Sequence, residues 1–413
     1  MPEMMDSYTF ANYYNYGSAN GHDGQYFSDE TMQRMLDFQA AGGSNKGGLL
    51  HNGSVWGKPA GDPFTTGYAN TDWYKEIYKE SAFSQEHNLS MNGGNEKVQY
   101  YASLGFLDQN GLLLHGEDTK QRFNVTAKIN SNLTDWLKFN YSIRFTRQDN
   151  VRPTRLNRSM YEKIGRQTWP NLPVYDENGF YHNSNADTPA MQLALGGERG
   201  VQTDKIYHQA AFVFEPIKNW VTNVEFNYGI NNMDVRETSL PYYNHDVNGN
   251  VIDTKGTSSL YQSYSKENYS NWNIYSNYSF TLNDDHNFKV MLGFQSEEQR
   301  QKFFSAKAYG LQVEELPELD LMSHTKGDGS ERSPEVSGYR NEWASAGFFG
   351  RLNYDYQGRY MAEANLRYDG SSRFRRGNRW QWSPSFSLGW NIAQEKFFED
   401  FTDLCNQLKL RLS

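Results

Sequence analysis

The chain has 413 residues, with 40 Lys and Arg against 49 Asp and Glu, and a formal net charge of −9. Nucleic acid is a disfavoured partner, because phosphate binding requires a net basic surface. The single cysteine, Cys405, excludes an internal disulfide framework and a cysteine-cluster metal site. Aromatic residues make up 15% of the chain, which argues against disorder in spite of its polarity. The fold must therefore combine many aromatic with many polar side chains.

Residues 1–85 differ in pattern from the rest of the chain. Ser28 precedes an acidic turn and Asp72 precedes Trp73, and both are typical of residues that cap the start of a helix. The stretch from Ala40 to Gly67 between these signals is rich in glycine and has no regular pattern. We therefore expect residues 1–85 to form a long irregular segment with short helices.

From residue 86 to residue 413 the hydrophobic pattern has a period of two. Between Phe123 and Asn130 every odd position is apolar and every even position is polar, which is typical of a strand with one dry and one wet face. The run from Leu137 to Thr146 repeats this pattern after a short polar turn. The same template predicts eleven strands and the beginning of a twelfth at Leu408, which the chain end at Ser413 would truncate.

Short and long connections alternate along these strands. The turns inside hairpins are short, whereas the links between hairpins are long: 107–121, 148–206, 232–268, 297–342 and 370–379. This sorting is a property of outer-membrane β-barrels, with short periplasmic turns and long extracellular loops, and a soluble sandwich has no reason to show it. The predicted fold class is all-β, an antiparallel transmembrane β-barrel. Four tryptophans near strand ends are expected to anchor at the two membrane interfaces: Trp136, Trp220, Trp343 and Trp380.

Several motifs carry a resemblance to a known family. They are Asn70-Thr71-Asp72-Trp73, His87 to Ser90, Tyr100 to Gly111, Leu366 to Phe374 and Pro384 to Trp390. With these motifs in this order, the chain resembles the SusC/RagA family of TonB-linked outer-membrane transporters of Bacteroidota. The resemblance implies a 22-stranded barrel filled by an N-terminal plug. Residues 86–413 would supply about 12 of the 22 strands and residues 1–85 the first extracellular loop, so the chain is expected to be a central barrel fragment.

The resemblance also implies a function. It implies TonB-dependent import of oligosaccharides or peptides through an outer membrane, with membrane lipids, TonB and a SusD-like lipoprotein as partners. An enzyme is not expected, because the sequence has no nucleophile-elbow, phosphate-loop or dinucleotide motif. The alternative from another class is a non-transporting surface or secreted all-β protein, such as an adhesin or a carbohydrate-binding sandwich.

Two groups of residues are candidates for a functional site. A cluster of charges could line the rim of the lumen and contact substrate or plug, or it could be a structural network of wall charges: Arg367, Asp369, Arg373, Arg375, Arg376 and Arg379. Aromatic residues in the long links could stack on sugar rings, or they could hold the loops together: Trp56, Trp169, Tyr175, Tyr181, Tyr242 and Tyr243.

No cofactor, metal or catalytic residue is predicted. The nine histidines are scattered without ligand spacing. The runs Asp176 to Gly179 and Asp246 to Asn250 superficially resemble calcium loops, but both lack the later ligands of such a loop. We expect both runs to be hairpin turns inside the extracellular loops.

Overall fold

The computed structural model describes residues 3–57, 63–182, 188–326, 328–401 and 405–413. One antiparallel sheet of 12 strands dominates it, and the order of strands in space follows the order in sequence from β3 to β16, with only β9 and β10 left out. The predicted all-β antiparallel fold is therefore confirmed. The strands of this sheet are β3 (Ser84–Gly94), β4 (Val98–Asn110), β5 (Thr119–Thr134), β6 (Leu137–Pro153), β7 (Glu198–Ile217), β8 (Trp220–Ser239), β11 (Ser259–Leu282), β12 (His286–Tyr309), β13 (Glu335–Tyr356), β14 (Tyr360–Ser371), β15 (Trp380–Asn391) and β16 (Lys409–Leu412).

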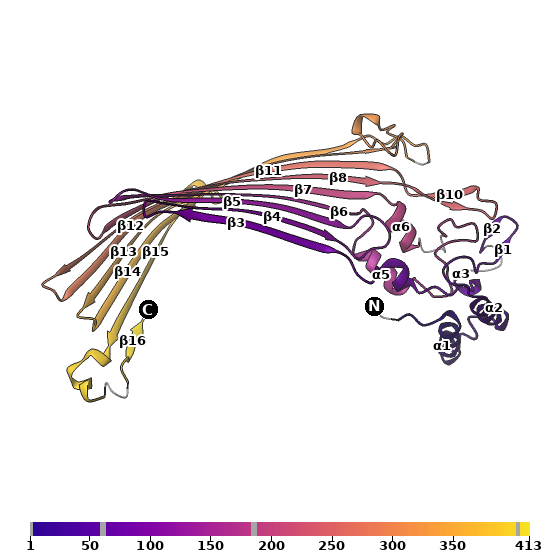
Figure 1. The fold of residues 1–413 in the computed structure, drawn as a ribbon, viewed down its shortest axis with the longest axis horizontal. Helices are drawn as coiled ribbons and strands as arrows, with labels where there is room; N and C mark the ends of the chain where they lie inside the picture. Colours follow the sequence, from indigo (N-terminus) through magenta and orange to yellow (C-terminus); the bar gives the residue numbers. More distant parts are fainter. Residues whose placement is uncertain (1–2, 58–62, 183–187, 327, 402–404) are drawn as a thin grey trace.

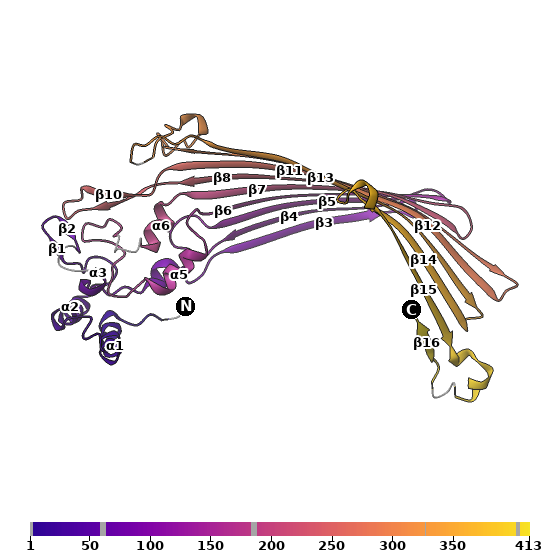
Figure 2. The same ribbon diagram turned by 180° about the vertical axis from the view of Figure 1, so that it is seen from behind.

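The sheet is long, curved and open, with β3 and β16 at its two edges (Figure 1). The short turns gather at one end of the strands. The helices and long loops gather at the other end, where many of them lie to one side of the sheet (Figures 1 and 2). Short turns on one end and large loops on the other are the arrangement that the connection lengths predict.

Strand register aligns large apolar side chains into rows on one face of the sheet, which we call the apolar face. One such row crosses eight strands: Phe139, Phe212, Val224, Ile274, Phe294, Phe348, Tyr368 and Trp382. The ring centroids of Phe294 and Phe348 lie 5.1 Å apart, and those of Tyr368 and Trp382 lie 4.3 Å apart. An aromatic pair at such a separation stabilises a fold by about 0.5–1.5 kcal/mol more than the burial of its apolar area alone.

The apolar face has a band of the right width for a membrane. On β11 the band runs from Trp272 to Phe280, with Ile274 and Tyr278 between them, and this span is nine residues long. A membrane-crossing β-strand needs about 9–11 residues. Large side chains of the band stay exposed on the chain itself, with Leu292 at 67% and Phe386 at 69%. A continuous exposed apolar band of this kind is a surface for lipid.

Several strands continue well beyond this band towards the loops. β11 and β12 each have 24 residues, and β7 and β8 each have 20. Most of the predicted link 232–268, and both ends of the predicted links 148–206 and 297–342, are therefore strand rather than loop. Both faces of these extensions are largely polar, so a period of two in hydrophobicity could not reveal them.

The short turns use residues that accept a left-handed backbone. Asn219 between β7 and β8 has a φ of 70°, and Asn283 between β11 and β12 has a φ of 51°. Asparagine adopts this conformation more readily than most residues. The link from β15 to β16 is an exception at this end, because it holds the 3₁₀ turns η3 (Ile392–Gln394) and η4 (Lys396–Phe401). The alternation of short and long connections thus does not extend to the last link.

Helices and small hairpins form a compact cluster at the loop end, which we call the loop cluster. Its first part precedes β3, and Ser28 and Asp72 cap α2 and α4 as predicted. The pattern missed α1, which has no charged residue and whose N-terminus is capped by Asp6. Residues 58–62 of the predicted irregular stretch lie outside the described residues. The elements are α1 (Ser7–Asn20), α2 (Asp29–Ala40), β1 (His51–Asn52), β2 (Val55–Trp56), α3 (Pro63–Thr66), α4 (Trp73–Ile77), α5 (Arg158–Arg166), α6 (Pro189–Leu195), β9 (Tyr242–His245) and β10 (Val251–Lys255). Two 3₁₀ turns lie in other links: η1 (Leu319–Leu321) between β12 and β13, and η2 (Arg376–Asn378) between β14 and β15.

The segment before β3 packs against later loops rather than standing apart. The Nε1 of Trp73 donates to the carbonyl oxygen of Trp169 at 2.9 Å, and the Asn171 amide donates to the carbonyl oxygens of Phe64 and Gly67. A buried core joins α4, α5 and α6. Within the described residues, no helix is both long and apolar enough to cross a membrane.

The assignment of the two faces leads to a prediction about membrane insertion. Leu292→Arg places a charge in the middle of the apolar band and should destabilise the barrel by about 2–4 kcal/mol. Asn277→Arg is the matched control, because Asn277 lies on the other face of the neighbouring strand. The measurement is the amount of folded, heat-modifiable protein in the outer membrane. Equal losses from both variants would contradict the assignment.

Candidate functional site

The face opposite to the apolar face, which we call the polar face, carries a connected set of hydrogen bonds on β11, β12 and β13. The Tyr269 hydroxyl and the Ser345 hydroxyl each donate to a different carboxylate oxygen of Glu297, both at 2.9 Å. Next to them, the Nε1 of Trp343 donates to the side-chain oxygen of Gln299 at 2.9 Å. The three strands are paired along this whole stretch, so the ladder holds these groups in a fixed array. Such an array can hydrogen-bond to a solute rich in hydroxyl or amide groups.

Part of the predicted charge cluster joins this surface. Arg367 makes two hydrogen bonds with Asp369, at 2.8 and 3.0 Å, and its guanidinium lies 5.2 Å from the ring centroid of Phe349. The guanidinium of Arg373 lies 5.3 Å from the ring centroid of Trp343. The cluster therefore reaches the hydrogen-bonded array through Arg373.

The other arginines of the cluster lie in the exposed turn between β14 and β15. Arg379 donates from Nε to the carbonyl oxygen of Phe374 at 3.1 Å and so closes this turn. Arg375 and Arg376 are exposed at η2. The structure thus pairs Arg367 with Asp369 on β14 and places the other four arginines in the exposed turn that follows, from which Arg373 reaches the Trp343 ring.

Trp343 does not lie where the sequence analysis placed it. The prediction of a membrane anchor is wrong for this residue, because its indole hydrogen-bonds to Gln299 on the polar face. Trp380, also at the loop end, instead stacks on Tyr368 of the apolar face with the centroids 4.8 Å apart. The two tryptophans have similar positions in the sequence, but strand parity sends them to opposite faces.

Trp169 is the centre of the aromatic packing in the loop cluster. Five rings lie within 6.3 Å of the Trp169 ring, centroid to centroid, and four of them come from the segment 10–27: Phe10, Tyr14, Tyr26, Phe27 and Phe64. The indole of Trp169 is half-buried among them. These contacts join α1 to the loop that follows α5.

The other predicted aromatics divide between packing and exposure. The Tyr175 and Tyr181 rings lie 5.0 Å apart, Trp56 packs against His51, and Tyr242 is buried. Tyr243, in contrast, is 37% exposed. Packing thus already engages most members of this group, and the stacking of sugar rings stays a prediction.

The two runs that resemble calcium loops are turns, as predicted. A carboxylate oxygen of Asp246 accepts from the backbone N–H groups of Asn248 and Asn250, which closes the turn between β9 and β10. Asp176 accepts in the same way from the N–H of Phe180. The amide of Asn178 donates to the carbonyl oxygen of Val247 at 2.9 Å, so the two turns touch.

Burial favours the neutral form of two histidines in the loop cluster. Burial lowers the pKa of His182 to about 4, and burial also lowers the pKa of His115, whose Nδ1 lies 3.1 Å from the hydroxyl of Tyr181. In both residues burial disfavours the charged imidazolium. Among the described residues, no group of three or more His, Cys, Asp or Glu side chains is arranged to hold a metal ion.

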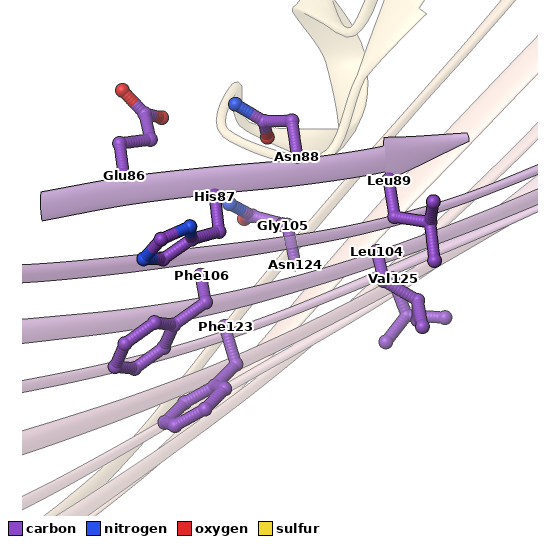
Figure 3. A pocket seen from close by; sticks show the side chains of 10 residues that line it. All are labelled: Glu86, His87, Asn88, Leu89, Leu104, Gly105, Phe106, Phe123, Asn124 and Val125. Carbon is purple, nitrogen blue, oxygen red and sulfur yellow. The ribbon is translucent and has the colours of Figure 1, made fainter.

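A shallow depression lies at the β3 edge of the sheet (Figure 3). On the apolar face, His87, Phe106 and Phe123 lie side by side in one row of the register. Leu89, Leu104 and Val125 form the next row. This depression is a continuation of the apolar band up to an unpaired edge strand, and its chemistry suits lipid or a further strand rather than a polar solute.

The array around Glu297 was missed by the sequence analysis. Tyr269, Glu297 and Gln299 fall at or near the ends of links that were predicted to be loops. Hydrophobic alternation stops before Glu297, because the neighbouring residues on both faces are polar. The remaining signal, an unbroken run of polar residues from Gln295 to Gln299, is shared by many exposed segments.

Two dissimilar faces, a membrane-wide apolar band and loops sorted to one end define the wall of an outer-membrane β-barrel. The family model described as TonB dependent receptor-like, beta-barrel, matches residues 163–413. The chain belongs to this family, whose members are outer-membrane transporters rather than enzymes. The family resemblance stated from the motifs is confirmed.

Individual relatives agree with this result. The TonB-dependent receptor SusC of Bacteroides thetaiotaomicron is 29% identical over 389 residues, which cover 87% of this chain and 36% of SusC. A TonB-dependent receptor of Formosa agariphila is 24% identical over 369 residues, which cover 85% of this chain and 34% of that receptor. The chain therefore spans about a third of the length of these relatives.

Solved structures show the same fold. The RagAB peptide importer in its closed-closed state matches with a TM-score of 0.69 at 18% identity, over 96% of this chain and 42% of that chain. Its open-open state matches with a TM-score of 0.67 at 19% identity, over 83% of this chain and 37% of that chain. At these identities the likeness concerns the fold alone.

The packing of Trp169 leads to a prediction about the loop cluster. Trp169→Ala removes a ring with five aromatic neighbours and should destabilise the cluster by about 2–3 kcal/mol, below the range for a fully buried tryptophan. Limited proteolysis of the protein in outer membranes measures this change as faster cleavage between α5 and α6. Tyr243→Ala is the control and should leave the cleavage rate unchanged. A Trp169 variant with the parent cleavage rate would contradict a packing role.

Proposed function

We propose that this chain is part of the wall of a TonB-dependent importer, and that its polar face lines the path of an oligosaccharide or peptide. The observation that carries this proposal is the difference between the two faces of the same strands. One face is an apolar band that suits lipid, and the other is a polar array that suits water and solute. Glu297 and Glu298 are neighbours in sequence, yet the first joins the polar array and the second pairs with Arg300 on the opposite face.

The proposed partners follow from the arrangement of the loops and from the relatives. TonB would supply the energy, and outer-membrane lipids would surround the apolar band. The loop cluster presents a large surface at the end of the sheet that we assign to the cell exterior, where a SusD-like lipoprotein would dock. The solved relatives described as a RagAB peptide importer support a two-component arrangement of this kind.

A secreted carbohydrate-binding sandwich is the second candidate. A sandwich would cover its apolar faces with a second sheet. Here the apolar band remains exposed across the whole 12-stranded sheet. The importer therefore accounts for the band, and the sandwich does not.

Sidedness gives the first test. An epitope tag inserted at Gly329 should be labelled on intact cells, because Gly329 lies in the link between β12 and β13 with open space around it. A tag at Asn283 should be labelled only after permeabilisation. Gly197 is a poor insertion site, since its φ of 92° and the close backbone of Thr238 constrain it. Reversed labelling would invert the proposed topology.

Transport gives the second test. Glu297→Ala removes the acceptor of two hydrogen bonds on the polar face and should raise the half-saturating substrate concentration about tenfold, as expected for the loss of one hydrogen bond to a charged group. Glu298→Ala is the matched control on the opposite face and should transport like the parent. The measurement is uptake of labelled oligosaccharides and peptides by cells that express the full-length receptor. An unchanged Glu297 variant, or equal effects of both substitutions, would count against this lining.

A further inference from the structure

Three basic side chains stand directly opposite one another on the outward side of the strand extensions. Lys266 of β11 pairs in register with Lys302 of β12, which pairs with Arg340 of β13. We call these three residues the basic row. Lys302 and Arg340 are exposed, and Lys266 is half-buried. All three have the parity of the apolar face, so they lie on the outer surface of the wall.

Three like charges in adjacent register positions repel one another, and like charges directly opposite on paired strands destabilise a sheet. Two nearby acidic residues are engaged by another cation, because Arg300 pairs with Glu298 and lies 4.0 Å from Glu342. Asp234 lies one row further along, opposite Tyr264. Within the described part of the chain, no ion pair is recorded for the basic row. An external anion would remove this repulsion.

The basic row lies just beyond the apolar band, on the loop side. Lys266 is six residues from Trp272 on the same face, which is about 20 Å along a strand. Strand tilt makes the distance along the membrane normal shorter. With the loops outside the cell, the row reaches into the headgroup layer of the outer leaflet.

Two exposed rings accompany the charges. Tyr264 and Phe304 are directly opposite each other in the next row, and they are 43% and 55% exposed. Gly338 lies opposite Phe304 on β13 and leaves one side of this ring without a neighbouring side chain. A row of cations beside a pair of open rings matches a phosphorylated sugar, with charge for the phosphate and ring faces for the pyranose.

We propose that the basic row, together with Tyr264 and Phe304, binds the phosphorylated sugar headgroup of lipopolysaccharide in the outer leaflet. The inference rests on the proposed sidedness of the barrel. It concerns the outer surface rather than the solute path. Bound lipopolysaccharide would neutralise the row and hold the long extensions of β11, β12 and β13 at a fixed height in the membrane.

The first experiment compares two triple variants of the full-length receptor with the same change in charge. The test variant is Lys266→Gln, Lys302→Gln and Arg340→Gln, and the control is Lys128→Gln, Lys138→Gln and Lys205→Gln, all on the polar face. Each basic side chain near an anionic membrane surface contributes about 1 kcal/mol, or roughly fivefold in affinity, so the test variant should bind about 100-fold more weakly. The probe is purified lipopolysaccharide titrated into receptor held in phosphatidylcholine nanodiscs. The control should bind within about twofold of the parent.

Two further arms define the ligand. Dephosphorylated lipopolysaccharide should bind the parent as weakly as intact lipopolysaccharide binds the test variant. Phe304→Ala with Tyr264→Ala should weaken binding of lipopolysaccharide but not binding of phosphatidylglycerol that is titrated into the same receptor-containing nanodiscs.

Several outcomes would overturn the inference. They are unchanged binding by the test variant, equal loss in the control, or equal loss for phosphatidylglycerol and lipopolysaccharide in the ring variant. Uptake assays on the same variants separate this inference from the proposed function. Normal uptake with unchanged lipopolysaccharide binding would remove the inference alone, whereas reversed tag labelling would remove the proposed sidedness.

Discussion

The pairing of backbone N–H and C=O groups inside a lipid bilayer is the constraint on which the rest of this structure depends. Water is absent there, so each strand must satisfy its polar backbone groups on both sides through its neighbours. β4 to β14 do so along most of their length, in one antiparallel ladder, whereas β15 is paired with β16 only from Leu388 to Asn391. β3 and β16 remain edges of the sheet, and an unpaired edge in lipid would cost several kcal/mol for each group. The same constraint explains why the register is so regular across the band.

A regular ladder fixes more than the backbone, because side chains alternate strictly between the two faces. Positions that face lipid carry apolar side chains and positions that face water carry polar ones, so a single strand contacts two environments. Beyond the band both faces are wet, and the selection for apolar residues ends. The outward positions there are free to carry charge, as in the basic row, without the cost that a charge in the band would have.

The sequence revealed the parts of the fold that this selection shapes. Strands through the band, their faces and their short turns followed from a period of two, and the caps at Ser28 and Asp72 followed from local chemistry. The extensions of β11 and β12 did not, because no apolar face marks them. Glu297 was missed for the same reason, and Trp343 was placed on the wrong face because its environment depends on parity at a poorly defined strand end. The sequence identified the members of the predicted charge cluster. It did not show that Arg367 is paired on the sheet whereas the later arginines lie in an exposed turn.

The loop cluster, at the loop end of the sheet, is held together by side-chain packing rather than by a strand ladder. Its parts come from before β3, from between β6 and β7, and from between β8 and β11, yet they share contacts across all three origins. Trp169 packs against the rings of the first segment, and Asn178 hydrogen-bonds to the turn at Val247. A common apolar core joins α4, α5 and α6 and adds to these contacts. Segments joined in this way move together more readily than one by one. A solute that approaches the polar face therefore meets a structured unit rather than a set of independent flexible loops.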